Sequence, residues 1–440
     1  MKIAGLVGVV ALLVLGAVGG AAGQGRTPVP GTSAPDVPPP AAASTAAQAI
    51  LDRARPAMIQ IKGFFGTNTA EAFHGSGFAV ARGGVFITNW HVVSEAVLYP
   101  EKYRLEYRTP AGATGHVTVR AIDIRHDLAL VEAHGIAPAA LSLRPNVALK
   151  GERAFSVGFP LDVGLTITEG VSNGRVEDSF EPRIHYSGAL NPGMSGGPGL
   201  DSSGNVIGVN VAGYFLSQLV AFLVPAEHAV ALLARARQAP LDTRRARDEV
   251  ASQLRAHSEA LLAALGSKLP TQNRQGYELP AKPAAFVECH AAGDPAPDQP
   301  VHVERITCDA KSSVYLGRNL HTGGLTFQHE VLSTRTLDSW RFAHRLQEAK
   351  TSYHTFGPPR QLAPFACTQH NVALNGFTAN AIVCLRAYRK LDGIYDLNLR
   401  VVSKSGPKRG FVSSLSLTGV AADRAVAFAR TYLDAMRWSP

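Results

Sequence analysis

Hydrophobic and polar residues alternate in short runs through residues 58–225, and Gly, Pro and Asn separate these runs. This pattern is typical of short β-strands joined by turns. The Gly-Asn pair within residues 201–206 also predicts a hairpin turn, because these residue types adopt positive φ readily. So many short strands at this spacing indicate barrels or sandwiches. We predict strands at residues 58–65, 75–80, 85–89, 103–109, 116–124, 128–133, 154–159, 164–177, 183–189, 205–213 and 220–225.

Helical patterns flank the strand-rich region on both sides. A short helix is predicted over residues 46–56, and helical spacing of apolar residues returns after Pro225. Residues 241–269 then have the pattern of a long amphipathic helix. Thr243 is its predicted N-cap, and Gly266 is its predicted stop signal.

The last part of the chain, residues 278–440, combines strand patterns with two further helical segments. It has the layout of two related halves. Each half contains a segment between two cysteines, then a strand pattern (325–333 or 411–420), and it ends in a helical pattern. We therefore predict an α+β module with the layout of an internal duplication.

The N-terminus has the pattern of an export signal. Lys2 precedes an apolar run over residues 3–18, and small residues follow it, with predicted cleavage near Ala22 or Gly23. The same run is long enough to be kept as a membrane anchor, which is the alternative interpretation. Residues 24–45 are rich in Pro and Ala and are predicted to form an extended linker. We therefore expect an exported protein, periplasmic or extracellular, without stable membrane insertion once the signal is removed.

The four cysteines all lie in the C-terminal module. An even number of cysteines in an exported chain predicts disulfides, and four cysteines allow three pairings. The sequential pairing closes two loops of similar size. A zinc site is the alternative, but the chain has no C-x-x-C pair. The cysteines are Cys289, Cys308, Cys367 and Cys384.

Composition separates several classes of protein. A chain of 440 residues is too long for one hydrophobic core, so two or three domains are expected. A content of 46% hydrophobic and 18% charged residues is typical of a folded protein. We divide the chain into a signal peptide (1–23), a linker (24–45), a β-rich domain (46–236), a helical connector (237–274) and the α+β module (275–440). The net charge of +9 is dispersed along the chain, without the basic clusters of a nucleic-acid-binding surface.

The segment "NPGMSGGP" (191–198) surrounds Ser195 with glycine and proline. A serine hydroxyl becomes a useful nucleophile only when a base removes its proton and donors stabilise the oxyanion. Gly193 has no Cβ, so its amide and that of Ser195 are free to converge on one point. The segment is therefore a candidate for both a nucleophile and an oxyanion hole.

A base and an orienting carboxylate are available earlier in the chain. His91 follows a predicted strand in "FITNWHVV", and Asp127 precedes another in "RHDLALVE". The order His, Asp, Ser fits a double β-barrel in which the first barrel carries His91 and Asp127 and the second carries Ser195.

Four blocks, "GSGF", "TNWHVV", "HDLALVE" and "NPGMSGGP…NVIGVN", occur in this order. Together they resemble the trypsin-like serine proteases of the chymotrypsin fold, and the HtrA/Deg-like branch in particular, over about residues 50–235. The resemblance implies that His91 is the general base, that Asp127 orients it and that Ser195 is the nucleophile. The Gly193 and Ser195 amides would form the oxyanion hole, and no cofactor or metal is implied.

The same resemblance indicates where the pocket for the P1 side chain would lie. None of its residues is acidic, so we predict cleavage of polypeptides after small or medium apolar residues. The expected substrate-binding residues are Ala189, Leu190, Val209, Val211 and Gly213.

After residue 236 the sequence departs from the HtrA pattern, because no equivalent of the PDZ peptide-binding loop is found there. The predicted function is an exported serine endopeptidase. The first alternative is a protease-fold binding or scaffold protein whose C-terminal module carries the function. In the second alternative, residues 278–440 also carry the role, and the protease only processes its own chain.

Overall fold

The computed structural model describes residues 44–146, 148–211, 219–235, 241–293, 299–348, 361–404 and 406–439. The predicted signal peptide and most of the linker lie outside these residues. Ser44 and Thr45 do not belong to a linker, because helix α1 (Thr45–Ala54) begins there and the Ser44 hydroxyl caps it by accepting the Ala47 amide at 3.2 Å. From Ser44 onward the chain forms one compact unit.

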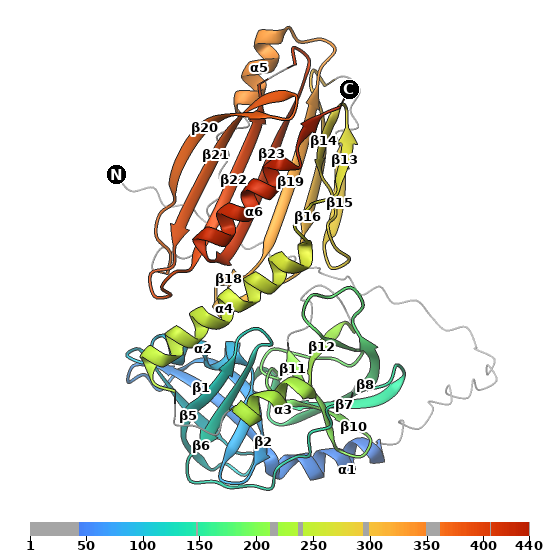
Figure 1. The fold of residues 1–440 in the computed structure, drawn as a ribbon. Helices are drawn as coiled ribbons and strands as arrows, with labels where there is room; N and C mark the ends of the chain where they lie inside the picture. Colours follow the sequence, from blue (N-terminus) through green and yellow to red (C-terminus); the bar gives the residue numbers. More distant parts are fainter. Residues whose placement is uncertain are drawn as a thin grey trace, which may run out of the picture. The chain divides into compact units, whose positions relative to one another are not determined.

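Two closed β-barrels confirm the predicted double barrel (Figure 1). In the first, the strands follow the order β1-β2-β3-β6-β5-β4, and helix α2 (Trp90–Leu98) connects β3 to β4. Its strands are β1 (Met58–Phe65), β2 (Glu71–Ala81), β3 (Val85–Thr88), β4 (Tyr103–Arg108), β5 (Thr114–Asp123) and β6 (Leu128–Ala133).

The second barrel has the order β10-β11-β12-β9-β8-β7. Its strands are β7 (Glu152–Gly158), β8 (Thr166–Arg175), β9 (Ile184–Tyr186), β10 (Pro198–Asp201), β11 (Val206–Val211) and β12 (Ala221–Pro225). Strand β10 was missing from the sequence prediction. Its sequence, PGLD, has the composition of a turn, but all four residues are buried between β7 and β11.

Two helices follow the second barrel: α3 (Ala226–Arg235) and the long α4 (Thr243–Leu265). The long helix confirms the amphipathic pattern, but its N-cap is Asp242 and not Thr243. The Asp242 carboxylate accepts the Arg245 amide at 2.9 Å, as capping side chains do. Gly266, with φ of 83°, ends the helix as predicted.

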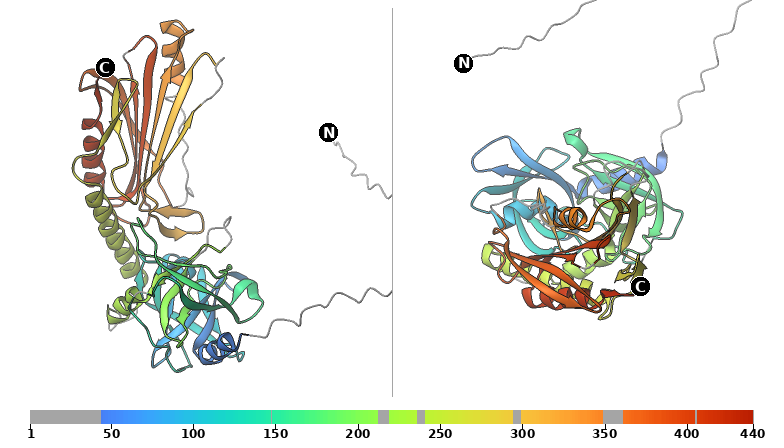
Figure 2. Two further views of the ribbon diagram at one scale, coloured as in Figure 1. Left: turned by 90° about the vertical axis from the view of Figure 1, so that its right-hand side faces the viewer. Right: turned by 90° about the horizontal axis from the view of Figure 1, so that it is seen from above.

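The C-terminal module is built on a seven-stranded antiparallel sheet with the order β15-β16-β19-β23-β22-β21-β20 (Figure 1). Helix α6 (Ala422–Asp434) lies along one face of it (Figure 2). The sheet strands are β15 (Glu288–Gly293), β16 (His302–Asp309), β19 (Leu325–Ser333), β20 (Ala366–Leu374), β21 (Phe377–Ala387), β22 (Tyr395–Ser403) and β23 (Arg409–Val420).

Smaller elements complete the module. Helix α5 (Ser339–Glu348) packs through Phe342 and Leu346 on Val412 of β23, and the neighbouring Phe411 joins the core beneath α6. Because neighbouring residues of a strand point to opposite faces, α5 and α6 cover opposite faces of the sheet. The remaining strands are the hairpin β17 (Val314–Gly317)–β18 (Leu320–Thr322) and the sheet β13 (Thr271–Arg274), β14 (Tyr277–Pro280) and β24 (Arg437–Trp438).

Both disulfides follow the sequential pairing, Cys289–Cys308 and Cys367–Cys384. All four cysteines are therefore used, which excludes the zinc alternative. Each bond joins residues that face each other across an antiparallel strand pair. The two cross-linked pairs, β15–β16 and β20–β21, lie at opposite edges of the sheet. The internal duplication stays a prediction.

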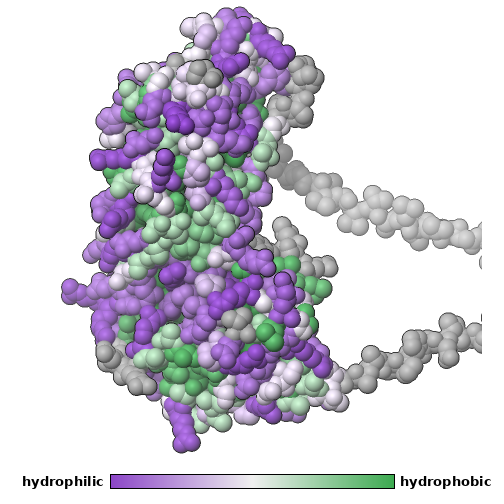
Figure 3. Space-filling view, turned by 45° about the vertical axis from the view of Figure 1, so that its right-hand side comes forward, coloured by the Kyte–Doolittle hydropathy of each residue, from purple (hydrophilic) through white to green (hydrophobic). Residues whose placement is uncertain are grey.

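On the face shown in Figure 3, hydrophilic residues alternate with hydrophobic patches. Among the described residues, no helix is both long enough and apolar enough to cross a membrane.

Candidate active site

His91 lies in the first turn of α2, immediately after the end of β3. Its Nδ1–H donates to the Asp127 Oδ2 atom at 2.7 Å, because a carboxylate can only accept. The His91 backbone amide donates to the other oxygen, Oδ1, at 2.9 Å. The carboxylate therefore fixes both the orientation and the tautomer of the imidazole, and Nε2 is left to accept a proton.

Asp127 is held in a left-handed turn between β5 and β6, with φ of 59°. Aspartate tolerates this region better than most residues. The Asp127 carbonyl accepts the Trp90 amide at 3.1 Å and the Asn89 side-chain amide at 2.8 Å. Both donors immediately precede His91, so the start of α2 and the Asp127 turn are bound to each other by backbone as well as side chain.

The pKa of His91 is raised above its usual value of 6.5. Burial alone would lower this pKa, but the negative charge of Asp127 and the hydrogen bond to it outweigh the burial. The protonated form of the His91 imidazole is therefore stabilised by Asp127.

The Ser195 segment adopts a conformation that requires glycine at two positions. Gly193 has φ of 95°, and a Cβ there would collide with the Phe159 carbonyl and lie 2.8 Å from His74 Nε2. Gly196 has φ of 85°, and a Cβ there would collide with the Ser76 carbonyl. These positive φ values and close approaches explain the glycine-rich sequence.

The backbone amides of this segment divide into two groups. Those of Met194, Gly196 and Gly197 donate to backbone carbonyls at 2.9–3.0 Å. In contrast, the amides of Gly193 and Ser195 have no acceptor among the described residues. They are the two amides that the sequence assigned to the oxyanion hole, and they remain available to a ligand.

The structure brings the Ser195 segment to the end of the strand that precedes His91. The Ser195 carbonyl accepts the Ser76 amide at 2.8 Å, and a Cβ on Gly196 would lie 2.9 Å from Asn89 N. Within the described residues, the Ser195 hydroxyl makes no hydrogen bond to His91. Such catalytic hydrogen bonds are commonly long without substrate and shorten when it binds.

Two polar residues that the sequence analysis did not single out hold this segment. The Ser76 hydroxyl donates to the Gly193 carbonyl at 2.7 Å and accepts the Phe159 amide at 3.0 Å. The buried Asn210 amide donates to the Met194 carbonyl at 3.2 Å. Ser76 lies in the motif "GSGF" and Asn210 in "NVIGVN". The motifs therefore included both residues, but the sequence did not show that their side chains hold the Ser195 segment.

The residues predicted to line the P1 pocket differ in their exposure to solvent. Ala189 is exposed, and Leu190 and Val211 are half-buried. Val209 is 0% exposed and packs in the hydrophobic core, so its side chain does not face a substrate. Gly213 lies outside the described residues.

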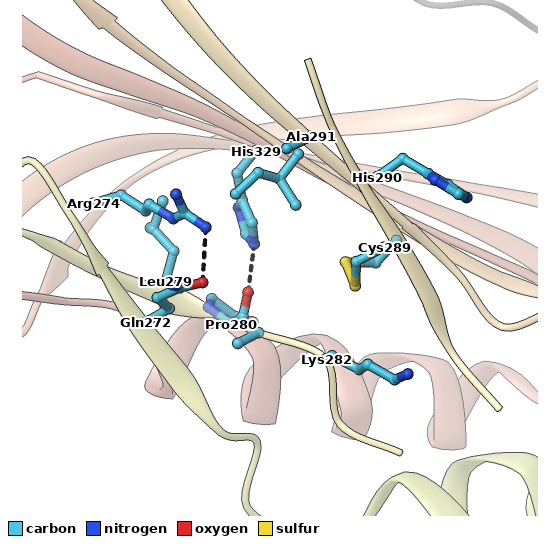
Figure 4. A pocket seen from close by; sticks show the side chains of 12 residues that line it. Gln272, Arg274, Leu279, Pro280, Lys282, Cys289, His290, Ala291 and His329 are labelled. Carbon is cyan, nitrogen blue, oxygen red and sulfur yellow. Dashed lines mark hydrogen bonds between the residues drawn. A yellow bond between two sulfur atoms is a disulfide. The ribbon is translucent and has the colours of Figure 1, made fainter. Parts of the chain in front are cut away.

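A cavity of about 300 Å³ in the C-terminal module is separate from this site. It is lined by Arg274, Lys282, His290 and the Cys289–Cys308 disulfide, and His329 donates to the Pro280 carbonyl at its wall (Figure 4). His91, Asp127 and Ser195 do not line it, so the cavity has no part in the chemistry discussed below.

Comparisons with known proteins find similarity to serine proteases. Residues 75–209 match the family model of the trypsin-like peptidase domain. The chain is 30% identical over 181 residues to the human serine protease HTRA3, covering 37% of this chain and 39% of HTRA3. It is 34% identical over 148 residues to a probable periplasmic DegP-like serine endoprotease of Chlamydia pneumoniae, covering 32% of this chain and 29% of that protein.

A solved serine endoprotease from Yersinia pestis is 20% identical, with a TM-score of 0.38 over 44% of this chain and 67% of that one. The curated relatives are matched over less than half of their length. Residues 75–209 nevertheless carry the family match, and they include all three residues of the candidate triad. The segment over residues 75–209 therefore matches the trypsin-like peptidase domain, and this chain is similar in sequence to the HtrA and DegP serine proteases.

Proposed function

We propose that this protein is an exported serine endopeptidase that hydrolyses polypeptides through an acyl-enzyme. The observation that carries the proposal is the pair of unoccupied amides at Gly193 and Ser195, in a segment that approaches Asn89, two residues before the imidazole that Asp127 orients. The relatedness to HtrA and DegP proteases supports the same reaction class.

Each group has a defined role in this reaction. His91 Nε2 takes the proton of the Ser195 hydroxyl as the oxygen attacks the scissile carbonyl. The Gly193 and Ser195 amides stabilise the oxyanion, an interaction typically worth about 3–4 kcal/mol per donor in the transition state. His91 then gives its proton to the leaving amine, and a water molecule, activated in the same way, releases the acyl group.

Covalent labelling tests the proposal directly. Diisopropyl fluorophosphate should phosphorylate Ser195 of the native protein with loss of fluoride, and mass spectrometry of peptides should locate the adduct there. The urea-unfolded protein is the control, and it should not react because an isolated serine hydroxyl is a weak nucleophile. Native protein that neither reacts nor cleaves an unfolded substrate would instead favour the scaffold alternative.

Activity should depend on the protonation of His91. Because His91 must be neutral to act as a base and its pKa is raised, kcat/KM should fall as the pH decreases through a value above 6.5. In Asp127→Ala, which leaves His91 without the carboxylate, the acid limb should move to lower pH, because burial lowers the pKa of His91 and the opposing charge is gone. A pH–rate profile of both proteins measures this, and identical limbs would contradict the assignment.

We also propose cleavage after small or medium apolar P1 residues such as Ala or Val. The support is the composition around Ala189, Leu190 and Val211, where no carboxylate stands to pair with Arg or Lys. A peptide library profiled by mass spectrometry should show this preference. Efficient cleavage after Arg with neglect of apolar residues would overturn it.

Export is supported by the two disulfides, which form and persist in oxidising compartments. Periplasmic relatives such as the DegP-like protease are consistent with this location.

The self-processing alternative predicts that the wild type and Ser195→Ala have different N-termini. N-terminal sequencing of both proteins tests this, and identical termini would argue against self-processing.

A further inference from the structure

The hairpin β17–β18 of the C-terminal module packs against the helix that carries His91. The Trp90 indole N–H donates to the Tyr315 carbonyl at 2.7 Å. Three apolar side chains of the hairpin are 1–5% exposed and belong to the same hydrophobic core as Trp90. These side chains are Val314, Leu316 and Leu320. The module therefore contributes directly to the surroundings of the candidate triad.

The hairpin is also fixed at its tip and at its base. At the tip, the Arg318 guanidinium donates to the Ala72 carbonyl of β2 at 2.8 Å. At the base, His257 of α4 lies 2.8 Å from the Gly323 carbonyl and 3.1 Å from the Ser312 hydroxyl, which flank the hairpin. These contacts at both ends hold the β17–β18 hairpin in a fixed position beside α2, so we treat it as a static part of the site and not as a mobile flap.

The Tyr315 side chain lies edge-on to the catalytic imidazole. Its ring centroid is 5.7 Å from that of His91, at an interplanar angle of 62°. On the hairpin itself, the His321 ring lies 5.3 Å from the Tyr315 ring. The Trp90 indole donates to the Tyr315 carbonyl, so a substitution of the Tyr315 side chain leaves this hydrogen bond in place.

Both of these hairpin side chains are uncharged near neutral pH. Burial raises the pKa of Tyr315 to about 12, with a further contribution from the negative charge of Glu95. Burial lowers the pKa of His321; the negative charge of Asp127 opposes this effect, and the neighbouring His91 adds to it. The hairpin therefore places two large, uncharged side chains, Tyr315 and His321, on the side of the site next to His91.

We propose that Tyr315 is a specificity-determining residue, which restricts the size of substrate side chains next to P1. The proposal rests on the proposed endopeptidase function. His91 must reach both Ser195 and the leaving amine, so the P2 and P1′ residues that flank P1 must pass beside its ring. A tyrosine against that ring occupies space that a large P2 or P1′ side chain would need, and the site should favour small ones.

The experiment compares kcat/KM over peptides that differ only at P2 and P1′, together with fluorophosphonate labelling of Ser195. Tyr315→Ala should raise the ratio of kcat/KM for Phe or Leu over Ala at one of these positions by about tenfold or more, the scale on which pockets discriminate size. Tyr315→Leu, which removes less volume, should shift it in the same direction. Tyr315→Phe should keep the wild-type profile, because the ring remains.

Ser313→Ala is the matched control, since Ser313 is exposed and immediately precedes the hairpin. An unchanged P2 and P1′ profile in Tyr315→Ala and Tyr315→Leu, with normal labelling, would overturn the inference. An equal increase for every substrate would overturn it too, because it would show general obstruction and not selection. Wild-type protein that neither labels nor cleaves would overturn the proposed function, and this inference with it.

Discussion

Ser195→Ala is expected to lower kcat by about a million-fold, the loss seen when a triad nucleophile is removed. This corresponds to about 8 kcal/mol of transition-state stabilisation. The fold should be unaffected, because the segment is held by the Ser195 carbonyl, which accepts the Ser76 amide at 2.8 Å. Steady-state hydrolysis of an unfolded protein, with thermal unfolding as the check on folding, measures both effects.

The double variant Ser195→Ala/His91→Ala sharpens this test. If the hydroxyl and the imidazole act as one unit, removing both should cost no more than removing Ser195 alone. A further loss of more than about tenfold in the double variant would show that His91 has a function independent of Ser195.

The sequence predicted both barrels because their strands are long enough to show alternation and are bounded by turn residues. Strand β1 was predicted with the bounds it has, Met58–Phe65, as was β6, Leu128–Ala133. Strand β10 was not predicted, since Pro198–Asp201 is identified as a strand only by its neighbours in the barrel.

The sequence predicted those residues of the candidate site that stand in short, recognisable motifs. His91, Asp127 and Ser195 each stand in such a motif, and the His91–Asp127 contact is present in the structure. Helix α2 was missed, although it determines where the His91 backbone amide points. Tyr315 was missed as well, because its proximity to His91 depends on long-range packing between the module and α2, which no local pattern encodes.

The N-cap of α4 shows the same limit at a smaller scale. Asp242 and Thr243 are adjacent and are both good capping residues, so propensity alone does not decide between them. Only the Asp242 carboxylate accepts the amide three residues later, and that fixes where the helix begins.

Asp127→Asn is expected to lower kcat by about 10,000-fold, although the substitution changes a single atom. The reason lies in the two donors that Asp127 accepts. The His91 backbone amide faces Oδ1 and can only donate, so the asparagine must place its carbonyl oxygen there. Its NH2 group then faces His91 Nδ1, which must lose its proton to accept. The proton moves to Nε2, and an imidazole protonated there cannot take the Ser195 proton.

This variant should fold normally and bind substrate with an unchanged KM, because asparagine also tolerates the φ of 59° at this position. The loss should therefore appear in kcat alone. Asp127→Ala provides the comparison: it removes the carboxylate without offering a donor to Nδ1, so the imidazole keeps both tautomers. Asp127→Ala should consequently be more active than Asp127→Asn. The reverse order, or a loss in Asp127→Asn of less than about tenfold, would show that the carboxylate does not act by fixing the tautomer of His91.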